Sequence, residues 1–156
     1  MKLRNLGFAF AVLLAASLAG SAWASEKKIK MADLPPAVKA AVMEQSKGAT
    51  LRGLSTETEN GKTTYEAELT VNGHSRDVEF DADGKVLEIE EAVAMDALPA
   101  PVRAGIEKGA GSNKIRKVES LTRDGKIVGY EAALVSAAGK RSEVQVDPQG
   151  NPAHLE

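Results

Sequence analysis

Hydrophobic and polar residues alternate with a period of two over several short stretches of this chain. The pattern is clear over residues 65–71, 77–80 and 87–90, and it is weaker over 50–59 and 115–123. Such alternation predicts β-strands that pack one face on a core and turn the other face outward. Asn-Gly and Asp-Gly pairs punctuate these stretches, and both pairs favour tight hairpins. The pattern therefore predicts antiparallel strands joined by short turns.

Two other stretches have apolar residues at helical spacing, each beside a proline that suits a first helical turn. The apolar stripes are Val38, Ala41 and Val42 in the first helix and Leu98, Val102 and Ile106 in the second. Gly48 and Gly109 are placed where a left-handed residue would end each helix. Helices of about 10 to 13 residues are marginal alone. We therefore expect both to pack on a sheet.

The same order of elements occurs twice, which predicts a duplication. Residues 34–42 align with 98–106, 65–69 with 130–134, and 78–84 with 144–150. Three matches in the same order indicate tandem repeats over residues 31–91 and 95–156. We expect an α+β fold of two tandem repeats, each a helix followed by three or four antiparallel strands. Both helices would pack on one face of the sheet, and the other face would stay open to water.

Residues 1–24 have the pattern of a secretory signal peptide: a positive start, an apolar stretch and small side chains at Ala22 and Ala24. We expect cleavage after Ala24, with residues 25–30 as a short lead. The alternative is an uncleaved anchor, because residues 6–24 are just long enough to cross a bilayer. The Ala- and Gly-rich composition favours cleavage. We therefore expect a periplasmic or secreted protein with no stable membrane insertion.

Charge and cysteine content narrow the classes of function. The chain has 20 Lys and Arg against 22 Asp and Glu. Loss of Lys2 and Arg4 with the signal peptide makes the mature chain more acidic. A nucleic-acid partner is not expected, because such proteins normally carry a clustered basic surplus. The absence of cysteine excludes disulfides and thiol chemistry.

Acidic residues concentrate on one predicted face of the first repeat. If the apolar residues of the strands face the helix, six carboxylates point to the other side: Glu66, Glu68, Asp77, Glu79, Glu88 and Glu90. The second repeat keeps Glu131 and Glu143 but is more mixed. These six residues are the candidate partner-binding face, since complementary charge selects partners and speeds association. The alternative is a solvated face whose charge prevents aggregation between sheets.

Signals for catalytic, cofactor-binding or metal sites are missing, so we expect none of the three. His74 and His154 lack partners at the spacing that zinc requires. The chain has neither a Gly-x-Ser-x-Gly elbow nor a phosphate-binding loop. Residues 81–84 resemble part of a calcium loop, but the further oxygen ligands are missing, and a hairpin turn explains the run. We therefore expect a protein without enzyme activity.

Three motifs together resemble a known family. Leu-Pro-x-x-Val at 34–38, Tyr-Glu-Ala-Glu-Leu at 65–69 and Val-Glu-Phe-Asp-Ala-Asp-Gly-Lys-Val-Leu at 78–87 are similar to the PepSY-like domain of exported bacterial proteins. Its fold is related to that of the beta-lactamase inhibitory protein. The resemblance covers nearly all of the mature chain, once per repeat. The second repeat departs at residues 151–155, where a last strand would be short or absent.

The resemblance implies an exported, non-catalytic module that binds other proteins, with no catalytic residues to carry over. The leading hypothesis is an inhibitor or modulator of an envelope or secreted hydrolase such as a peptidase. One alternative is a small-ligand or cation-binding envelope protein that uses the cleft between repeats or the Asp-rich turns. Another is a structural or stress-related periplasmic protein with no specific ligand.

Overall fold

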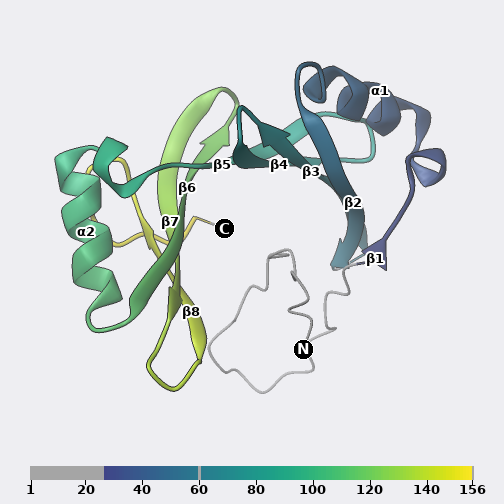
Figure 1. Cartoon of the computed structure of the whole chain (residues 1–156). Coiled ribbons are helices and arrows are strands. Elements are labelled where there is room, and N and C mark those ends of the chain that lie inside the picture. The colour runs from purple at the N-terminus through teal and green to yellow at the C-terminus, as the bar shows by residue number, and fades with distance from the viewer. Residues whose placement is uncertain (1–26, 60, 156) are drawn as a thin grey trace.

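A computed structural model describes residues 27–59 and 61–155, which form one antiparallel sheet and two helices (Figure 1). The expected signal peptide and its cleavage site lie outside the described residues. The strands are β1 (Lys27–Lys28), β2 (Thr50–Glu59), β3 (Lys62–Val71), β4 (His74–Phe80), β5 (Val86–Ala92), β6 (Lys114–Arg123), β7 (Lys126–Val135) and β8 (Arg141–Val146). The helices are α1 (Pro36–Gln45) and α2 (Ala100–Ala110), and single 3-10 turns η1 (Met31–Asp33) and η2 (Met95–Ala97) precede them.

Each strand pairs with the next one along the chain, so the sheet has the order β1 to β8. Tight turns make this possible: Asn72 and Gly73 have φ values of 51° and 87°, and Asp124 and Gly125 have 47° and 73°. Positive φ at both central residues is the geometry of a turn whose twist matches that of antiparallel strands. The predicted Asn-Gly and Asp-Gly hairpins are confirmed at these positions.

Both helices pack on the same face of the sheet, as the sequence predicts. On the first helix's side, Ala67 pairs with Val78 and Val78 with Ile89. The next ladder pairs Ile89 with Thr122. On the same face of β6, Val118 lies four residues before Thr122, and Val118 is buried in the cluster under α2. Because side chains alternate along a strand, this path stays on one face.

The apolar residues form two separate clusters, one under each helix. The cluster under α1 contains Leu34, Val38, Val42, Leu54, Ala67, Leu69, Val78 and Phe80. The cluster under α2 contains Leu98, Val102, Ile106, Ala110, Val118, Tyr130, Ala132, Leu134 and Val146. Full burial of a side chain such as Phe80 or Leu69 contributes about 1.5–3 kcal/mol. Five of the six predicted stripe residues are thus confirmed as core residues, and the sixth, Ala41, is partly buried and packs against the first cluster.

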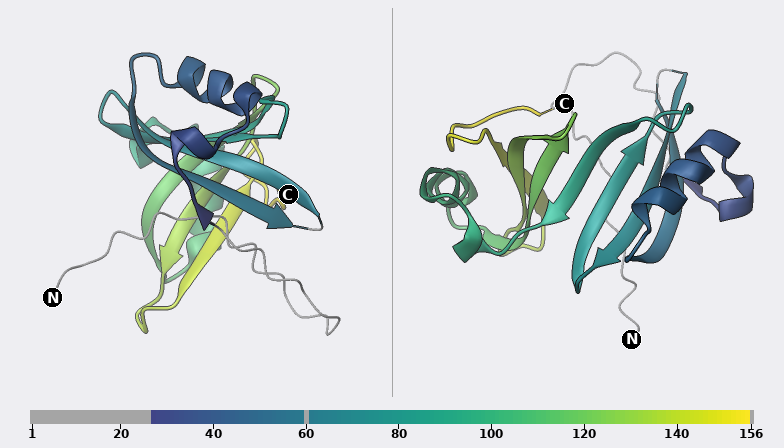
Figure 2. Two further views of the ribbon diagram at one scale, coloured as in Figure 1. Left: turned by 90° about the vertical axis from the view of Figure 1, so that its right-hand side faces the viewer. Right: turned by 90° about the horizontal axis from the view of Figure 1, so that it is seen from above.

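The sheet is strongly bent, and α1 and α2 lie at opposite ends on the outer side of the bend (Figures 1 and 2). Register shifts occur between Leu51 and Gly53 in the pairing of β2 with β3, between Glu79 and Phe80 in that of β4 with β5, and at two places in that of β6 with β7. Such bulges increase local twist and bend a strand. The polar face of the sheet therefore becomes the inner side of the bend.

The same glycine contact occurs in both halves. Gly84 has φ 79°, and a Cβ there would lie 2.6 Å from the Ala37 carbonyl oxygen in the first turn of α1. Gly150 has φ 83° and meets the Pro101 carbonyl in the first turn of α2 in the same way. A side chain would be strained at both positions, because of the positive φ and the close backbone. The correspondence agrees with the predicted duplication, which itself stays a prediction.

The second half meets one expectation of the sequence and contradicts another. Residues 151–155 form no strand but only an isolated bridge between Val146 and Pro152, as the divergent end of the second repeat predicts. The prediction that Gly109 ends the second helix is wrong, because α2 continues to Ala110 and Gly111 takes the positive φ. Gly109 instead lies against the Val144 side chain, where a Cβ would clash.

Candidate functional site

Cross-strand pairing places all six predicted acidic residues on the inner face of the sheet. They form two rows that run across β3, β4 and β5. The first row is Glu66, Glu79 and Glu88, and the second row is Glu68, Asp77 and Glu90. Like charges that lie directly opposite one another on neighbouring strands destabilise a sheet. The first half of the molecule therefore concentrates charge at an energetic cost.

The acidic rows continue into the second half of the molecule. Glu90 on β5 pairs with Leu121 on β6, and Glu119 lies two residues earlier on the same face of that strand. Glu119 in turn pairs with Glu131 on β7. We call this surface the inner acidic face and define it by eight residues: Glu66, Glu68, Asp77, Glu79, Glu88, Glu90, Glu119 and Glu131.

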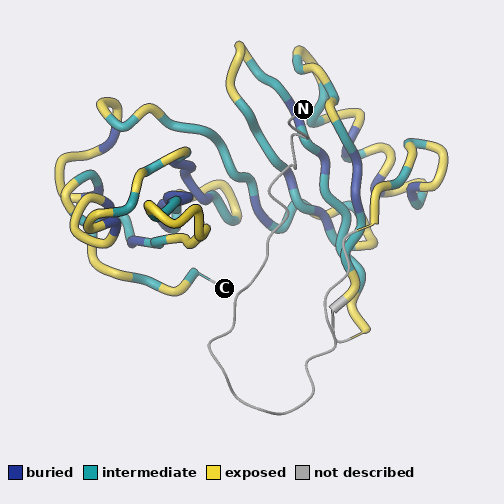
Figure 3. The backbone as a smooth tube through the Cα atoms, turned by 60° about the horizontal axis from the view of Figure 1, so that its bottom comes forward, coloured by how far each residue is buried: buried dark blue, intermediate teal, exposed yellow. Residues whose placement is uncertain are grey.

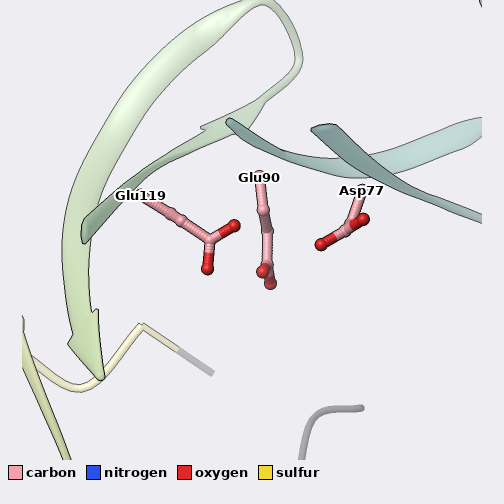
Figure 4. Close-up of side chains that lie close together, drawn as sticks. All are labelled: Asp77, Glu90 and Glu119. Carbon is pink, nitrogen blue, oxygen red and sulfur yellow. The ribbon is translucent and has the colours of Figure 1, made fainter. Parts of the chain in front are cut away.

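Three of these carboxylates converge where the two halves meet. Asp77, Glu90 and Glu119 come from β4, β5 and β6 and point toward the same inner space (Figure 4). One carboxylate oxygen of each lies within 4.8 Å of those of the other two. The bend explains this approach, since side chains on the inner side of a curved sheet come closer at their tips than at their backbones.

Burial and mutual repulsion shift the acid–base behaviour of this cluster. Burial, with the carboxylates of Glu119 and Glu68, raises the pKa of Asp77 to about 6, although Lys117 opposes the shift. Burial raises the pKa of Glu90 to about 9, and the surrounding carboxylates add to the shift. A buried carboxylate without a cation of its own is costly to ionise. Glu90 is therefore protonated in the folded protein at neutral pH.

Lys117 on β6 supplies positive charge to the cluster. Its Nζ lies 2.6 Å from Glu119 Oε1 and 3.7 Å from Asp77 Oδ2. Burial alone would lower the pKa of Lys117, but the carboxylates of Glu119, Asp77 and Glu90 together raise it. Burial also raises the pKa of Glu119, against the influence of Lys117. Three carboxylates are the ligands that a hard cation prefers, but here the Lys117 ammonium already compensates two of them.

A second ion pair joins Arg123 to Glu88, the last residue of the first acidic row. Arg123 Nε on β6 donates to Glu88 Oε2 at 2.5 Å, and the same guanidinium donates to the Leu155 carbonyl. Burial raises the pKa of Glu88 and Arg123 lowers it, with a net rise. Glu88 is only 5% exposed. Pairing with Arg123 is what makes a carboxylate tolerable at this depth.

The expectation that this face is open to water is wrong for part of it. Glu119 and Leu121 lie on the inner face but are 7% and 0% exposed. The C-terminal segment lies over β7 and β8 here: Leu155 N donates to Gln145 Oε1 at 2.8 Å. Its side chain packs against Gly129, the cross-strand partner of Leu121. The bend of the sheet and the C-terminal segment together shield this part of the inner face from solvent. Most residues of β3 to β5 are half-buried or buried (Figure 3).

The basic members of the site and one of its acids were not predicted from the sequence. Lys117, Glu119 and Arg123 all lie within the stretch 115–123, which was correctly predicted as a strand. The alternation of Lys117, Glu119 and Leu121 was a usable signal for one face. However, a register shift between Ile115 and Lys117 interrupts this strand and blurs the period-two pattern.

The remaining candidate residues are not brought together. His74 and His154 are both exposed, at the start of β4 and near the C-terminus. The Asp81 Oδ1 atom accepts hydrogen bonds from the backbone N–H groups of Asp83 and Lys85, at 3.0 and 2.9 Å. The turn itself therefore uses this oxygen, which is the hairpin role that the sequence predicts.

The chain belongs to the family whose model matches residues 63–153, more than half of its length. The family is described as "Putative beta-lactamase-inhibitor-like, PepSY-like". The predicted resemblance to PepSY-like proteins is thereby confirmed. The match runs from β3 past β8. The description names an inhibitor-like domain and no catalytic activity.

Solved structures share this fold. A DUF2874 family protein from Bacteroides ovatus ATCC 8483 is 16% identical, with a TM-score of 0.60, over 78% of this chain and 85% of that chain. A structure from Bacteroides eggerthii DSM 20697, described as "putative periplasmic proteins", is 15% identical, with a TM-score of 0.63, over 78% and 86%. A BLIP-like protein from Bacteroides fragilis NCTC 9343 is 18% identical, with a TM-score of 0.57, over 78% and 84%.

At these identities the likeness extends to the fold alone. No match was found among curated proteins. Within residues 27–59 and 61–155, no helix is long and apolar enough to span a membrane.

Proposed function

We propose that this chain is an exported, non-catalytic protein-binding module whose inner acidic face docks on a basic surface of a partner protein. The observation that carries the proposal is the gathering of eight carboxylate residues on one side of the bent sheet. Glu90 is protonated at neutral pH, and Lys28, Lys117 and Arg123 offset only part of the charge of the other seven. Complementary potential of this kind steers association and selects partners.

The burial of the face favours docking over simple solvation. A sheet face that is charged only to stay soluble would hold its carboxylates where water solvates them. Here Glu88 and Glu119 are buried, and burial raises the pKa values of Asp77 and Glu90. Such a costly arrangement is typical of functional sites, where stability is given up for activity. The arrangement supports a surface shaped for a ligand.

The family supports a protein as the ligand and a hydrolase as the class of partner. The descriptions of the family and of the B. fragilis structure both refer to a beta-lactamase-inhibitor-like fold. The periplasm is the proposed location, because a similar structure is described as periplasmic and residues 1–24 have the pattern of a signal peptide. A secreted or envelope hydrolase with a basic surface is therefore the partner that we propose.

Charge reversal on the face tests the proposal. The mature chain is immobilised and exposed to envelope extract, beside a variant with Glu66→Lys, Glu68→Lys and Glu79→Lys. The matched control reverses three acidic residues that are exposed on or beside the helices: Glu44→Lys, Asp96→Lys and Glu107→Lys. We expect the control to retain a basic protein that the face variant loses. If all three proteins retained the same basic protein, the inner acidic face would not be the docking surface.

A second step separates binding from inhibition. The protein that the wild type retains is purified, and its hydrolytic activity is measured against increasing amounts of the module. Loss of activity in proportion to complex formation is expected for an inhibitor. If the saturated complex kept full activity, the chain would bind its partner without inhibiting it, and the inhibitor hypothesis would be rejected.

A further inference from the structure

The two halves of the molecule are joined by one short ladder. β5 and β6 pair over four positions, from Ile89–Thr122 to Ala92–Glu119, and none of the described residues belongs to both apolar clusters. The cluster under α1 draws its strand residues from β2 to β5, and the cluster under α2 draws them from β6 to β8. The angle between the halves therefore depends on this ladder and on the side chains that cross it.

The inner side of this joint carries mostly acidic groups. Asp77, Glu90 and Glu119 converge there from three adjacent strands (Figure 4). Two buried or half-buried ion pairs cross the joint, Lys117 with Asp77 and Arg123 with Glu88. Lys85 and Asp124 also approach, at 3.5 Å, but both are well exposed and contribute little.

We propose that the β5–β6 ladder is a proton-controlled joint. With Glu90 protonated, its carboxyl group packs between those of Asp77 and Glu119, and the sheet keeps its tight bend. With Glu90 ionised, repulsion among the three carboxylates opens the bend and moves the two halves apart on the inner side. This proposal concerns the chain alone and does not rest on the proposed partner.

The charges around Glu90 explain why its proton matters. The groups that face it are Asp77 on β4, Glu88 on β5, Lys117 and Glu119 on β6, and Glu131 on β7. Lys117 is paired with Glu119 and Asp77, and Arg123 is paired with Glu88. No cation within the described chain is paired with Glu90. Loss of the Glu90 proton therefore adds repulsion that the existing pairs do not cancel.

The carboxyl groups of this cluster lose their protons in different ranges of pH. The pKa of Asp77 is raised to about 6 and that of Glu90 to about 9, in both cases chiefly by burial. The opening step is therefore expected in mildly alkaline solution, where Glu90 ionises. Ionisation of Asp77 alone leaves the bend closed, because Lys117 lies beside it.

A distance measurement between the two halves tests the joint. The chain has no cysteine, so Lys62→Cys and Lys140→Cys place two unique spin labels in the exposed β2–β3 and β7–β8 hairpins. These hairpins lie on opposite legs of the bend (Figure 1). Pulsed electron–electron double resonance then gives the distance between the two spin labels at about pH 6 and about pH 9.5.

The expected result is a longer mean distance at the higher pH in the labelled wild type. Glu90→Gln mimics the protonated side chain and is expected to keep the short distance at both pH values. Glu79→Gln, on the same face but away from the cluster, is expected to behave as the wild type. An unchanged or shorter distance in the wild type at high pH overturns the proposal. An equal increase of the distance in Glu90→Gln at high pH would also overturn it. Circular dichroism checks that all variants are folded.

Discussion

Lys117 on β6 places its Nζ 3.7 Å from Asp77 Oδ2 on β4, so this ion pair spans strand β5 and links the two halves of the molecule. The same ammonium lies 2.6 Å from Glu119 Oε1. A single cation thus holds together two carboxylates that would otherwise repel each other across the joint. Its removal leaves buried negative charge without compensation.

Replacement of Lys117 by Met should therefore destabilise the fold. We expect the free energy of unfolding to fall by about 2–4 kcal/mol at pH 7, because one partner of a buried pair is removed. Urea unfolding followed by circular dichroism measures this. At about pH 5 the loss should be smaller, since Asp77, whose pKa is raised to about 6, is then largely protonated. Lys114→Met, on the exposed start of the same strand, is the control and should change little. An equal loss in both variants would contradict this role of Lys117.

Stability should decrease as pH rises from about 5 to about 9. Burial raises the pKa of Glu90 from 4.5 to about 9 and that of Asp77 from 3.8 to about 6. Between the unfolded and folded values, the folded protein binds more protons than the unfolded chain, so the free energy of unfolding falls with rising pH. At about 1.4 kcal/mol per pKa unit, shifts of this size correspond to a fall of several kcal/mol, which lowers Tm by roughly ten degrees or more.

The variant Glu90→Gln isolates the alkaline part of this dependence. It cannot lose the proton, so its Tm should stay level between about pH 7 and pH 9, where the wild type declines. Glu79→Gln should decline as the wild type does. Thermal unfolding of the three proteins across that range decides the matter, and parallel curves for all three would assign the decline to other groups.

Gly129 should be intolerant of any side chain, because it lets the C-terminal segment approach the sheet. A Cβ at this position would lie 2.6 Å from the Val146 carbonyl oxygen and would clash with Leu155. Gly129→Ala is expected to lower the free energy of unfolding by about 1–3 kcal/mol through overpacking. Hydrogen exchange at the Leu155 amide should also accelerate. Ser142→Ala, on the exposed edge of β8, should affect neither measurement, and slow exchange of Leu155 in Gly129→Ala would count against this anchoring.

Calcium titration tests the alternative of a cation-binding protein. Because the Lys117 ammonium already compensates Asp77 and Glu119, we expect no binding heat at millimolar calcium in the wild type. Isothermal calorimetry measures it directly. Saturable heat that disappears in Asp77→Asn would favour the cation-binding alternative instead.

The sequence pattern was sufficient to assign strand side chains to one face of the sheet, but it was not sufficient to predict how deeply they are buried. The side-chain period of two is a local property of an extended backbone, so Glu66, Glu68 and Asp77 could be assigned to one face without knowing the fold. Their burial could not be assigned, because it depends on the bend of the sheet and on the C-terminal segment. Both are set by contacts between residues far apart in the chain.

The central cluster was hidden for a related reason. Glu119 meets Asp77 and Glu90 only because β5 pairs with β6, and nothing in the alternation of either stretch specifies that pairing. The register shift after Ile115 then displaces Lys117 from the simple pattern. Gly109 was misread because a glycine near a helix end usually signals a cap, whereas here it makes room for Val144.

The most direct test of docking on the inner acidic face is the affinity of the captured partner for the module at two salt concentrations. Surface plasmon resonance would compare the wild type, the face variant with Glu66, Glu68 and Glu79 changed to Lys, and the helix control of equal charge. We expect the wild type and the control to bind with affinities that fall as salt rises, and the face variant to lose binding at both concentrations. Equal affinities for all three proteins would contradict docking on this face.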